Sequence, residues 1–236
     1  MPSIHLIAYQ IEAPGVFNEA DSRLAFPVVV PTLEKKAFTV LYDGRCKNPY
    51  CVIETLTKDS LQGIAERTKH SFAEDEELPT HLRATLTDYK NSCYDRGHLA
   101  AAANNKHSEQ TMRDSFLLSN IAPQDPSFNR FYWAKFDRHI RELAKVYECV
   151  RVISGPLYLT KDGPEGRFVH VKVIGDSDTW CTTHFFKVIE LNNGNEVETQ
   201  AFILPNQHIS PETPLNAFQV SVEKIERVSG ILFRSA

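Results

Sequence analysis

A histidine, an asparagine, an aspartate and two arginines lie near the middle of the chain, at spacings that could serve one reaction. The run Asp95–His98 reads DRGH, and Asn129, Asp137 and Arg141 follow it. A histidine with an unperturbed pKa near ~6.5 can take a proton from water at neutral pH. An amide oxygen is a suitable ligand for Mg²⁺, and guanidinium groups bind phosphate. The combination predicts phosphodiester hydrolysis, with His98 as the general base.

The later residues of this set fall in the clearest helical pattern of the chain. Apolar residues recur at spacings of three and four between residues 129 and 147, which predicts a helix. Asn129, Trp133, Asp137 and Arg141 are each four apart, so they would share one face of it. Asn129 would open this helix, with Ser127 as its N-cap. Polar residues on an inward face indicate a polar cleft.

Each of these residues has a simpler interpretation when taken alone. DRGH could be an exposed turn, Asn129 a helix cap, and the pair Asp137 and Arg141 an ordinary surface ion pair. The joint pattern favours a site, because every simple interpretation would have to hold independently. The other histidines show no such pairing and are expected on the surface or in the packing: His70, His81, His107, His139, His170, His184 and His208.

The elements that must position these residues alternate irregularly, with many strands and few helices. Strands are predicted at 37–42, 50–56, 150–156, 168–174, 184–191 and 198–204, and a short helix within 215–233. Asp43-Gly44 predicts a hairpin between the first two strands, and Asn192–Asn195 one between the last two. Residues 68–82 are predicted to form a surface loop. We therefore expect an α+β fold with a largely antiparallel central sheet and helices packed on its faces.

Length and composition fit one soluble globular domain. The chain has 236 residues, of which 42% are hydrophobic and 24% charged. We expect an irregular N-terminal arm at 1–36 and a single domain at 37–236. The sequence contains no apolar run long enough to insert into a membrane, and the first 25 residues resemble no targeting segment.

The net charge of −4 argues against a basic shell of the kind that many nucleic-acid binders carry. The charge is unevenly distributed, however. Residues 90–151 contain ten Lys or Arg against seven Asp or Glu, an excess of three that leaves the remainder at −7. This distribution indicates a local positive cleft, which would still let a product leave.

The five cysteines do not form a metal-binding pattern. Cys46 and Cys51 are five apart, and no second pair follows them. Reduced, mostly buried thiols in an intracellular protein are therefore expected. A structural-zinc protein with incidental histidines is a competing interpretation, which the cysteine spacing disfavours.

The motifs resemble those of the DNA/RNA non-specific endonucleases of the ββα-metal superfamily. The resemblance covers about residues 38 to 235. It is carried by the block from Tyr94 to Asn104, the block Phe116–Gln124, Asn129 with Trp133, and three later landmarks: Ser154–Leu157, Thr183–Val188 and Ser229–Phe233.

The resemblance implies a role for each site residue. It makes His98 the general base and Asn129 the sole direct protein ligand of Mg²⁺, with Mn²⁺ as a substitute. Asp137 stands where the family has a glutamate that holds metal-bound water. Arg96 and Arg141 stand at phosphate-binding arginines, and Asn120 and Gln124 at polar positions that support the site. Arg67 is the candidate for a further arginine upstream.

The resemblance also implies the reaction and the setting. Both DNA and RNA would be cut endonucleolytically, leaving 5′-phosphate and 3′-hydroxyl ends. The architecture would contain a ββα-metal finger: the motif strand, a second strand, and a helix from about 128. The mitochondrial branch of the family is the most similar, so a homodimer, a mitochondrial location with release to the nucleus, and a protein inhibitor are expected.

Two departures from the family pattern stand close to the motifs. Asp137 is one methylene shorter than the family's glutamate, which would loosen its hold on the metal's water. It is also the one feature that favours a second interpretation, a catalytically silent member that only binds nucleic acid or a partner protein. Cys93 stands where a glycine is common just before DRGH, so it would stiffen that approach or place a redox-sensitive thiol beside the site.

Overall fold

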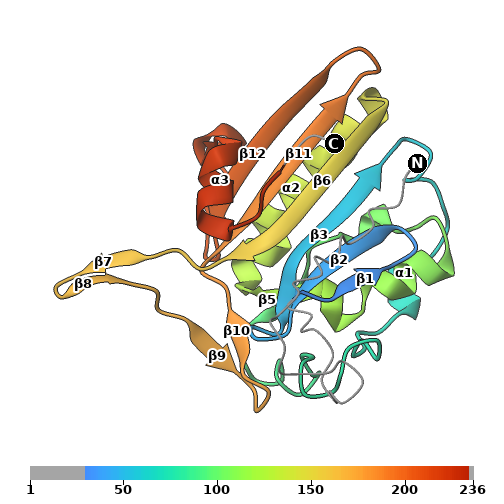
Figure 1. Ribbon diagram of the computed structural model, residues 1–236. Coiled ribbons are helices and arrows are strands. Elements are labelled where there is room, and N and C mark those ends of the chain that lie inside the picture. The colour runs from blue at the N-terminus through green and yellow to red at the C-terminus, as the bar shows by residue number, and fades with distance from the viewer. Residues whose placement is uncertain (1–29, 234–236) are drawn as a thin grey trace, which may run out of the picture.

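A seven-stranded antiparallel sheet forms the centre of the computed structural model, which describes residues 30–233 (Figure 1). Its strands lie in the order β1 (Thr32–Glu34), β2 (Phe38–Asp43), β3 (Asn48–Leu56), β6 (Cys149–Leu157), β11 (His184–Asn192), β12 (Val197–Pro205) and β13 (Gln219–Val220). The predicted α+β class with a largely antiparallel sheet is confirmed.

Both predicted hairpins are present in the sheet. β2 pairs with β3 across the turn that contains Asp43-Gly44, and β11 pairs with β12. In the second turn, the Asn193 amide donates a 3.2 Å hydrogen bond to the Glu196 carbonyl, and Gly194 has a φ of +91°. A positive φ is readily available to glycine, which explains why an Asn-Gly run marks this turn.

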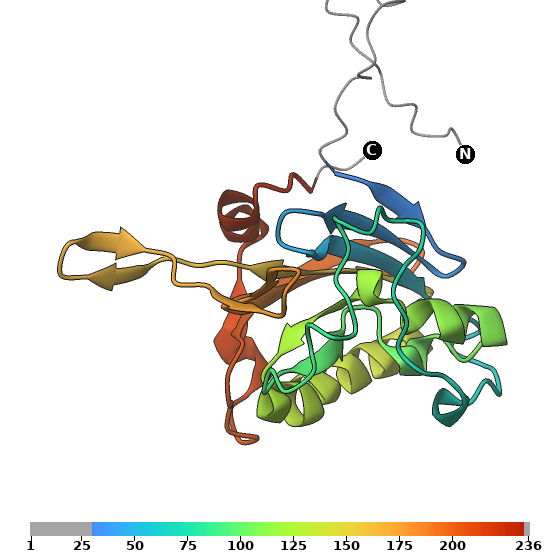
Figure 2. The same cartoon turned by 90° about the horizontal axis from the view of Figure 1, so that it is seen from below.

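The strands bury alternate residues on the two faces of the sheet. One face carries Val52, Val150, Phe185 and Ile189, which pack with the buried residues of the helix α2 (Ala134–Val146). The other carries Cys51, Phe186, Val188 and Ala201, which pack around Ile225 of the helix α3 (Val222–Ser229). Figure 2 shows these two helices, yellow-green and dark red, on opposite sides of the sheet.

The helices begin and end where the sequence supplies caps. α1 (Glu109–Ser115) starts with a capping box between Ser108 and Thr111. α3 starts at Ser221, whose hydroxyl accepts a hydrogen bond from the Lys224 amide, and ends at Gly230 with a φ of +76°. α2 buries Phe136, Ile140 and Ala144, residues that recur at helical spacing along one face.

The start of the predicted helix at 129 differs from expectation. A π-helical turn, η5 (Phe128–Trp133), precedes α2, and the Ser127 side chain makes no cap hydrogen bond. The predicted Ser127 cap is therefore wrong. Asp125 caps the helix instead, because its Oδ1 accepts hydrogen bonds from the backbone amides of Ser127 and Phe128 at 2.9 and 3.0 Å. π-turns are rare and occur often at functional sites.

A separate two-stranded sheet brings the motif strand to this helix. β4 (Asp95–His98) pairs with β5 (Ile121–Gln124) in antiparallel register, and the turn η5 follows β5 after three residues, Asp125 to Ser127. This strand, strand, helix unit is the ββα finger that the resemblance implied.

The remaining elements are short. The predicted strand at 168–174 is wrong as a single strand: β8 (Gly166–Phe168) pairs with β7 (Lys161–Gly163), whereas β9 (Lys172–Ile174) pairs with β10 (Thr179–Cys181). Residues 161–170, which include the β7–β8 pairing, are exposed, so no packing enforces a continuous strand from 168 to 174. The β7–β8 hairpin projects from the body in Figure 1. Single turns occur at η2 (Arg67–Lys69), η3 (Ala102–Asn104), η4 (Leu118–Asn120) and η6 (Leu215–Phe218).

The expected N-terminal arm lies mostly outside the described residues, which begin at 30. Within the described part, Thr32–Glu34 forms the edge strand β1, so these residues are not irregular as predicted. All five cysteines are free thiols, and Cys46, Cys51 and Cys181 are buried. No helix within residues 30–233 has the length and apolar character that crossing a bilayer requires.

Candidate active site

The motif strand β4 presents its side chains in two directions. Because successive side chains of a strand point to opposite faces, Arg96 and His98 lie on one side and Asp95 and Gly97 on the other. The DRGH run is therefore an ordered strand rather than an exposed turn, and it divides the site into a histidine side and an asparagine side.

His98 is enclosed by aromatic rings. It is 8% exposed, and its ring centroid lies 5.3 Å from that of Phe72 and 5.1 Å from that of Phe116. Its Nε2 is buried without a hydrogen-bond partner among the described residues. Burial, and then the positive charge of Arg67, lower the pKa of His98 to about 3. The imidazole is therefore neutral at neutral pH, with a nitrogen available to accept a proton.

Two of the predicted phosphate-binding arginines surround this histidine. The Arg96 guanidinium lies over the Phe72 ring at 5.1 Å and near the Tyr89 ring at 5.9 Å, and its Nε is buried without a partner. Arg67 lies 5.9 Å from the Phe116 ring and is exposed. Both positive charges thus border the aromatic pocket of His98, where a phosphate anion would be attracted.

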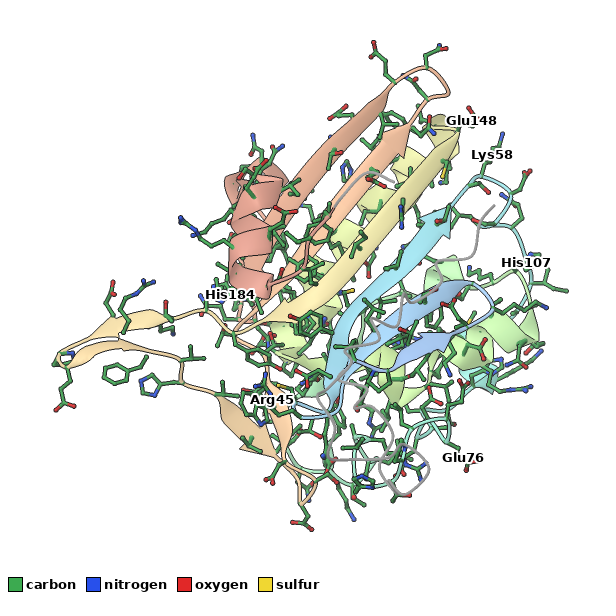
Figure 3. All side chains as sticks on the ribbon, in the orientation of Figure 1. Arg45, Lys58, Glu76, His107, Glu148 and His184 are labelled. Carbon is green, nitrogen blue, oxygen red and sulfur yellow. The ribbon has the colours of Figure 1, made fainter. Side chains whose placement is uncertain are left out.

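His70 also belongs to this side, although the sequence gave no reason to select it. Its ring stacks on Phe116 with centroids 6.1 Å apart, and its Nε2 lies 2.8 Å from a carboxylate oxygen of Glu109. By contrast, His107 and His184 lie far apart on the molecule: His107 is near α1, and His184 is near the point where the β7–β8 hairpin leaves the body (Figure 3).

Asn129 occupies the other side of the motif strand. Its Nδ2 donates a 2.9 Å hydrogen bond to Oδ2 of Asp95. The guanidinium of Arg130 binds the same carboxylate through two bonds, at 2.8 and 2.7 Å. Burial opposes ionisation of Asp95, but these hydrogen bonds outweigh it and lower the Asp95 pKa. Asp95 is thus an acceptor that orients Asn129 and Arg130.

The donor set at Asn129 fits a hydrated Mg²⁺. Because Nδ2 is used by Asp95, the side-chain carbonyl oxygen is left as a single neutral, hard ligand. Mg²⁺ commonly keeps several of its waters and binds few protein oxygens. Within residues 30–233, no three His, Cys, Asp or Glu side chains are grouped so that they could hold a metal ion.

Two hydrogen bonds tie these sides together. Trp133 Nε1 donates to the backbone carbonyl of His98 at 3.0 Å, and Asn129 reaches Asp95 three residues earlier on the same strand. The π-turn therefore lies along β4, with Trp133 at the histidine end and Asn129 at the aspartate end. The two bonds thus fasten the turn that carries Asn129 to the strand that carries His98, which lies 31 residues earlier in the sequence.

Gln124 and Asn120 are buried behind the motif strand. Both amide atoms of Gln124 lack partners among the described residues, and a Cβ on Gly97 would lie only 2.1 Å from its Cδ. Gly97 is therefore needed for space. Asn120 is fully buried and bonds only backbone groups: its Oδ1 accepts from the Ala100 amide, and its Nδ2 donates to the carbonyls of Ala100 and Ser115. Asn120 thus holds the chain that follows His98.

Asp137 and Arg141 point from α2 into a buried polar cluster. Asp137 is 9% exposed and pairs with Lys187 at 3.2 Å. Burial raises the pKa of Asp137, whereas the Lys187 ammonium lowers it. Arg141 donates to Oδ1 of Asn104 at 3.2 Å, and the Asn104 amide donates to both carboxylate oxygens of Glu54. The expected polar inward face is therefore present. Asp137 and Arg141 do not form an ion pair with each other at the surface; they bind Lys187 and Asn104 instead.

Some contacts of the site were missed from the sequence. Arg130 and Lys187 were not selected from the sequence. The available signal for Lys187 was a lysine in the centre of the apolar run His184–Leu191. The backbone of Cys93 is also informative: its φ is +67°, in a region that favours glycine.

Comparison with known proteins gives the family. The sequence profile of the DNA/RNA non-specific endonucleases matches residues 23–236. Human mitochondrial endonuclease G is 37% identical over 214 residues, covering 90% of this chain and 72% of that protein. The mitochondrial nuclease of Saccharomyces cerevisiae is 39% identical over 236 residues, covering 95% of this chain and 70% of that protein.

A solved structure shares the fold. The crystal structure of an EndoG/EndoGI complex, which describes a mechanism of EndoG inhibition, superposes with a TM-score of 0.85 at 38% identity. The match covers 88% of this chain and 87% of that chain. Endonuclease G is the mitochondrial branch that the motifs resemble, so the expected resemblance is confirmed. The chain therefore belongs to the DNA/RNA non-specific endonuclease family and is a nucleic-acid-hydrolysing enzyme.

Proposed function

We propose that the protein is a Mg²⁺-dependent endonuclease that hydrolyses phosphodiester bonds of DNA and RNA, leaving 5′-phosphate and 3′-hydroxyl ends. The observation that carries this proposal is the unpartnered Nε2 of His98, buried beside Arg96 on the strand that Asn129 joins through Asp95. A neutral imidazole with a free nitrogen, in a pocket bordered by guanidinium groups, is suited to activating water next to a phosphate.

Each residue has a stated task in this proposal. His98 removes the proton from the attacking water, and Arg96, Arg141 and Arg67 bind phosphate oxygens. Asn129 is the protein ligand of the metal, and Asp137 holds water of the metal's hydration shell. Gln124 and Asn120 support the site from behind the strand. When bound, Mg²⁺ supplies positive charge that stabilises the additional negative charge of the transition state, and Mn²⁺ is proposed to substitute for it.

The structural contacts support the role proposed for His98. Its pocket is closed by Phe72 and Phe116, so little solvent competes for the ring nitrogen. The Trp133 hydrogen bond to the His98 carbonyl fixes the backbone at that position. Arg67 helps to keep the His98 ring unprotonated in the free protein, and the guanidinium groups of Arg67 and Arg96 favour an approaching phosphate. The negative charge of that phosphate would raise the His98 pKa again and so favour proton uptake.

Supercoiled plasmid gives the direct test. We expect relaxation and degradation by the wild-type protein with Mg²⁺, and none with EDTA. His98→Ala should reduce the rate by about 100-fold or more, the usual contribution of general acid–base catalysis. Asn129→Ala should raise the Mg²⁺ concentration needed for half-maximal cleavage. If wild type and variants alike bind the plasmid in the presence of Mg²⁺ but leave it uncut, the proposal is contradicted.

The substrate range and the products need separate measurements. A structured RNA should be cut under the same conditions, because non-specific recognition uses phosphate rather than base edges. Products that a ligase joins without prior phosphorylation would establish 5′-phosphate and 3′-hydroxyl ends. Fragments that need phosphorylation first would overturn this part of the proposal.

The cellular setting is proposed from the relatives. The named endonuclease G and yeast nuclease are mitochondrial, so we propose a mitochondrial location for this protein, with release to the nucleus. We further propose a homodimer, tested by sedimentation of the full chain.

A protein inhibitor is proposed by analogy, because the EndoG structure was solved with EndoGI in a study of EndoG inhibition. Titrating such an inhibitor into the plasmid assay tests this proposal.

A further inference from the structure

A lysine lies in the middle of the sheet, where two motifs without an assigned role meet. Lys187 of β11 is fully buried. It stands directly across from Ser154 of β6 in the strand register. Its Nζ donates a 2.8 Å hydrogen bond to the Ser154 hydroxyl. The landmarks Thr183–Val188 and Ser154–Leu157 therefore come together through these two side chains.

The ammonium group faces α2. It forms an ion pair with Asp137 Oδ1 at 3.2 Å, lies 4.2 Å from the centroid of the Trp133 ring, and is 5.9 Å from that of Phe136. A cation over an aromatic ring at this distance is attracted to the ring, most strongly when both are removed from water. Lys187 thus contacts both Trp133 of the π-helical turn and Asp137 of α2.

Burying a charged lysine is costly, and an apolar residue of similar size would often serve the sheet equally well. The surrounding positions of β11 are apolar: Phe185, Phe186, Val188 and Ile189 are all buried. Stability alone does not account for a charge at this position. The position of its partners supplies another reason, since Trp133 donates to the His98 carbonyl and Asp137 stands two turns after Asn129.

We propose that Lys187, held by Ser154, is a positioning residue that fixes the Asp137 carboxylate and the Trp133 indole, and through them the relation of the helix to the motif strand. This inference rests on the proposed function, since it assigns Lys187 to the support of His98 and Asp137. The ion pair engages Oδ1 of Asp137. The second oxygen of that carboxylate has no hydrogen-bond partner among the described residues and can face the hydration shell of the metal.

The short side chain of Asp137 makes this arrangement important, because a small rotation of its carboxylate would move the second oxygen away from the site. The Lys187 ammonium restricts that rotation from one side. Residues that orient the groups around a metal typically change its affinity or the activity by about 10- to 100-fold when they are replaced.

The test uses three variants of the full chain. Lys187→Met removes the charge and keeps an unbranched chain. Ser154→Ala removes one hydrogen bond and leaves the charge in place. Val188→Ala is the matched control, because it is the next residue of the same strand, is 2% exposed, and packs on the opposite face under α3. Each variant is measured for thermal unfolding, for the Mg²⁺ concentration at half-maximal plasmid cleavage, and for its indole NMR signals.

The indole signals report on position without any metal. The chain has two tryptophans, Trp133 and Trp180, so Trp180→Phe leaves the Trp133 signal alone. In that background Lys187→Met should shift the Trp133 N–H resonance, and Ser154→Ala should shift it in the same direction by less. Val188→Ala should leave it unchanged while it lowers the unfolding temperature.

The activity measurements separate positioning from stability. Lys187→Met is expected to raise the half-maximal Mg²⁺ concentration by about 10-fold or more, Ser154→Ala by a smaller factor, and Val188→Ala not at all. If Lys187→Met and Val188→Ala lose activity only in proportion to their loss of stability, with the same Mg²⁺ requirement and an unshifted Trp133 indole resonance, the inference is overturned.

If Lys187→Met does not fold, Ser154→Ala decides the question. An unchanged Trp133 indole resonance and an unchanged Mg²⁺ requirement in Ser154→Ala overturn the inference. A wild-type protein that does not cleave with Mg²⁺ overturns the proposed function instead.

Discussion

The Asn129 amide nitrogen donates a 2.9 Å hydrogen bond to Asp95 Oδ2, and this bond determines which atom of Asn129 is free. An asparagine side chain can rotate by half a turn and exchange its oxygen and nitrogen. A carboxylate accepts hydrogen bonds only, so it selects the orientation in which the nitrogen faces Asp95 and the oxygen faces away. The first residue of DRGH therefore prepares the proposed metal ligand on the helix.

Asp95→Asn should weaken the proposed metal site without removing its ligand. An amide at this position can accept from or donate to Asn129, so both orientations of Asn129 would be populated. We expect a higher Mg²⁺ concentration at half-maximal plasmid cleavage and a smaller change in the maximal rate. Arg130→Gln is the matched control, because it removes the other partner of Asp95 and leaves its carboxylate. An equal rise in the Mg²⁺ requirement in both variants would refute the role given to the Asn129 bond.

Gly97→Ala should destabilise the protein by about 1–3 kcal/mol, the usual cost of overpacking a buried position. The added methyl group would lie 2.1 Å from Gln124 Cδ, too close for either residue to remain in place. Chemical denaturation of the single variants and of Gly97→Ala/Gln124→Ala measures the coupling. Because Gln124→Ala removes the colliding atoms, the double variant should recover part of the loss. Losses that simply add would show that the clash lies elsewhere.

Cys93→Gly should stabilise the protein by about 1 kcal/mol, because a side chain in the left-handed region is disfavoured by roughly that amount. Cys93 has a φ of +67° and is exposed, so its replacement removes little packing. Thermal unfolding under reducing conditions measures the effect. Cys93→Ala is the control: it removes the thiol and keeps the side chain at the same φ, so it should bring no gain. A gain in both variants would point to the thiol rather than to the backbone.

The sheet and the ββα unit could be predicted because their signals are local. Alternating residues, an Asn-Gly turn and a helical repeat each describe a few neighbouring positions. The surroundings of His98 could not be predicted in the same way. His70 and Phe72 lie in the range interpreted as a surface loop, and only the folded chain brings them to Phe116 and His98.

Two further differences have the same physical origin. A helical repeat gives spacing but not the hydrogen-bond pattern, so the π-turn before α2 was not apparent. Lys187 could not be identified from the sequence for a related reason. An apolar run predicts a buried strand whether or not one of its members is charged, and the partners that neutralise that charge, Asp137 and Ser154, come from other elements.

Glu54 should make stability fall as the pH rises. Burial raises its pKa to about 7, with Lys187, Asn104 and Arg141 acting in the opposite direction. Because the folded-state pKa lies above the ordinary glutamate pKa of 4.5, the folded protein binds the additional proton. The associated stability is fully present below about pH 4.5 and is lost as the pH rises through about 7. The difference in the free energy of unfolding between wild type and Glu54→Gln should therefore change with pH between about 4.5 and 7 and be constant above that range. Taking the difference removes the contributions of His98 and Asp137, which titrate in overlapping ranges. A wild-type profile identical to that of Glu54→Gln would contradict the assignment.

His98 should act in the opposite direction over a more acidic range. Its pKa is lowered from 6.5 to about 3 by burial and by Arg67, so the unfolded chain binds the proton more readily than the folded protein. The stability that this histidine contributes is therefore present above about pH 6.5 and is lost as the pH falls toward about 3. Between these values the loss approaches about 1.4 kcal/mol per pH unit.

His98→Asn isolates this contribution, because asparagine does not titrate. The difference in the free energy of unfolding between wild type and His98→Asn should change with pH in that window and be constant above it, where both side chains are neutral. Measurements on His184→Asn provide a comparison, since burial also lowers the pKa of His184, which is half-buried and lies outside the site. If the difference in the free energy of unfolding between wild type and His98→Asn stays constant from pH 7 to 4, His98 is more open to water than its aromatic surroundings indicate.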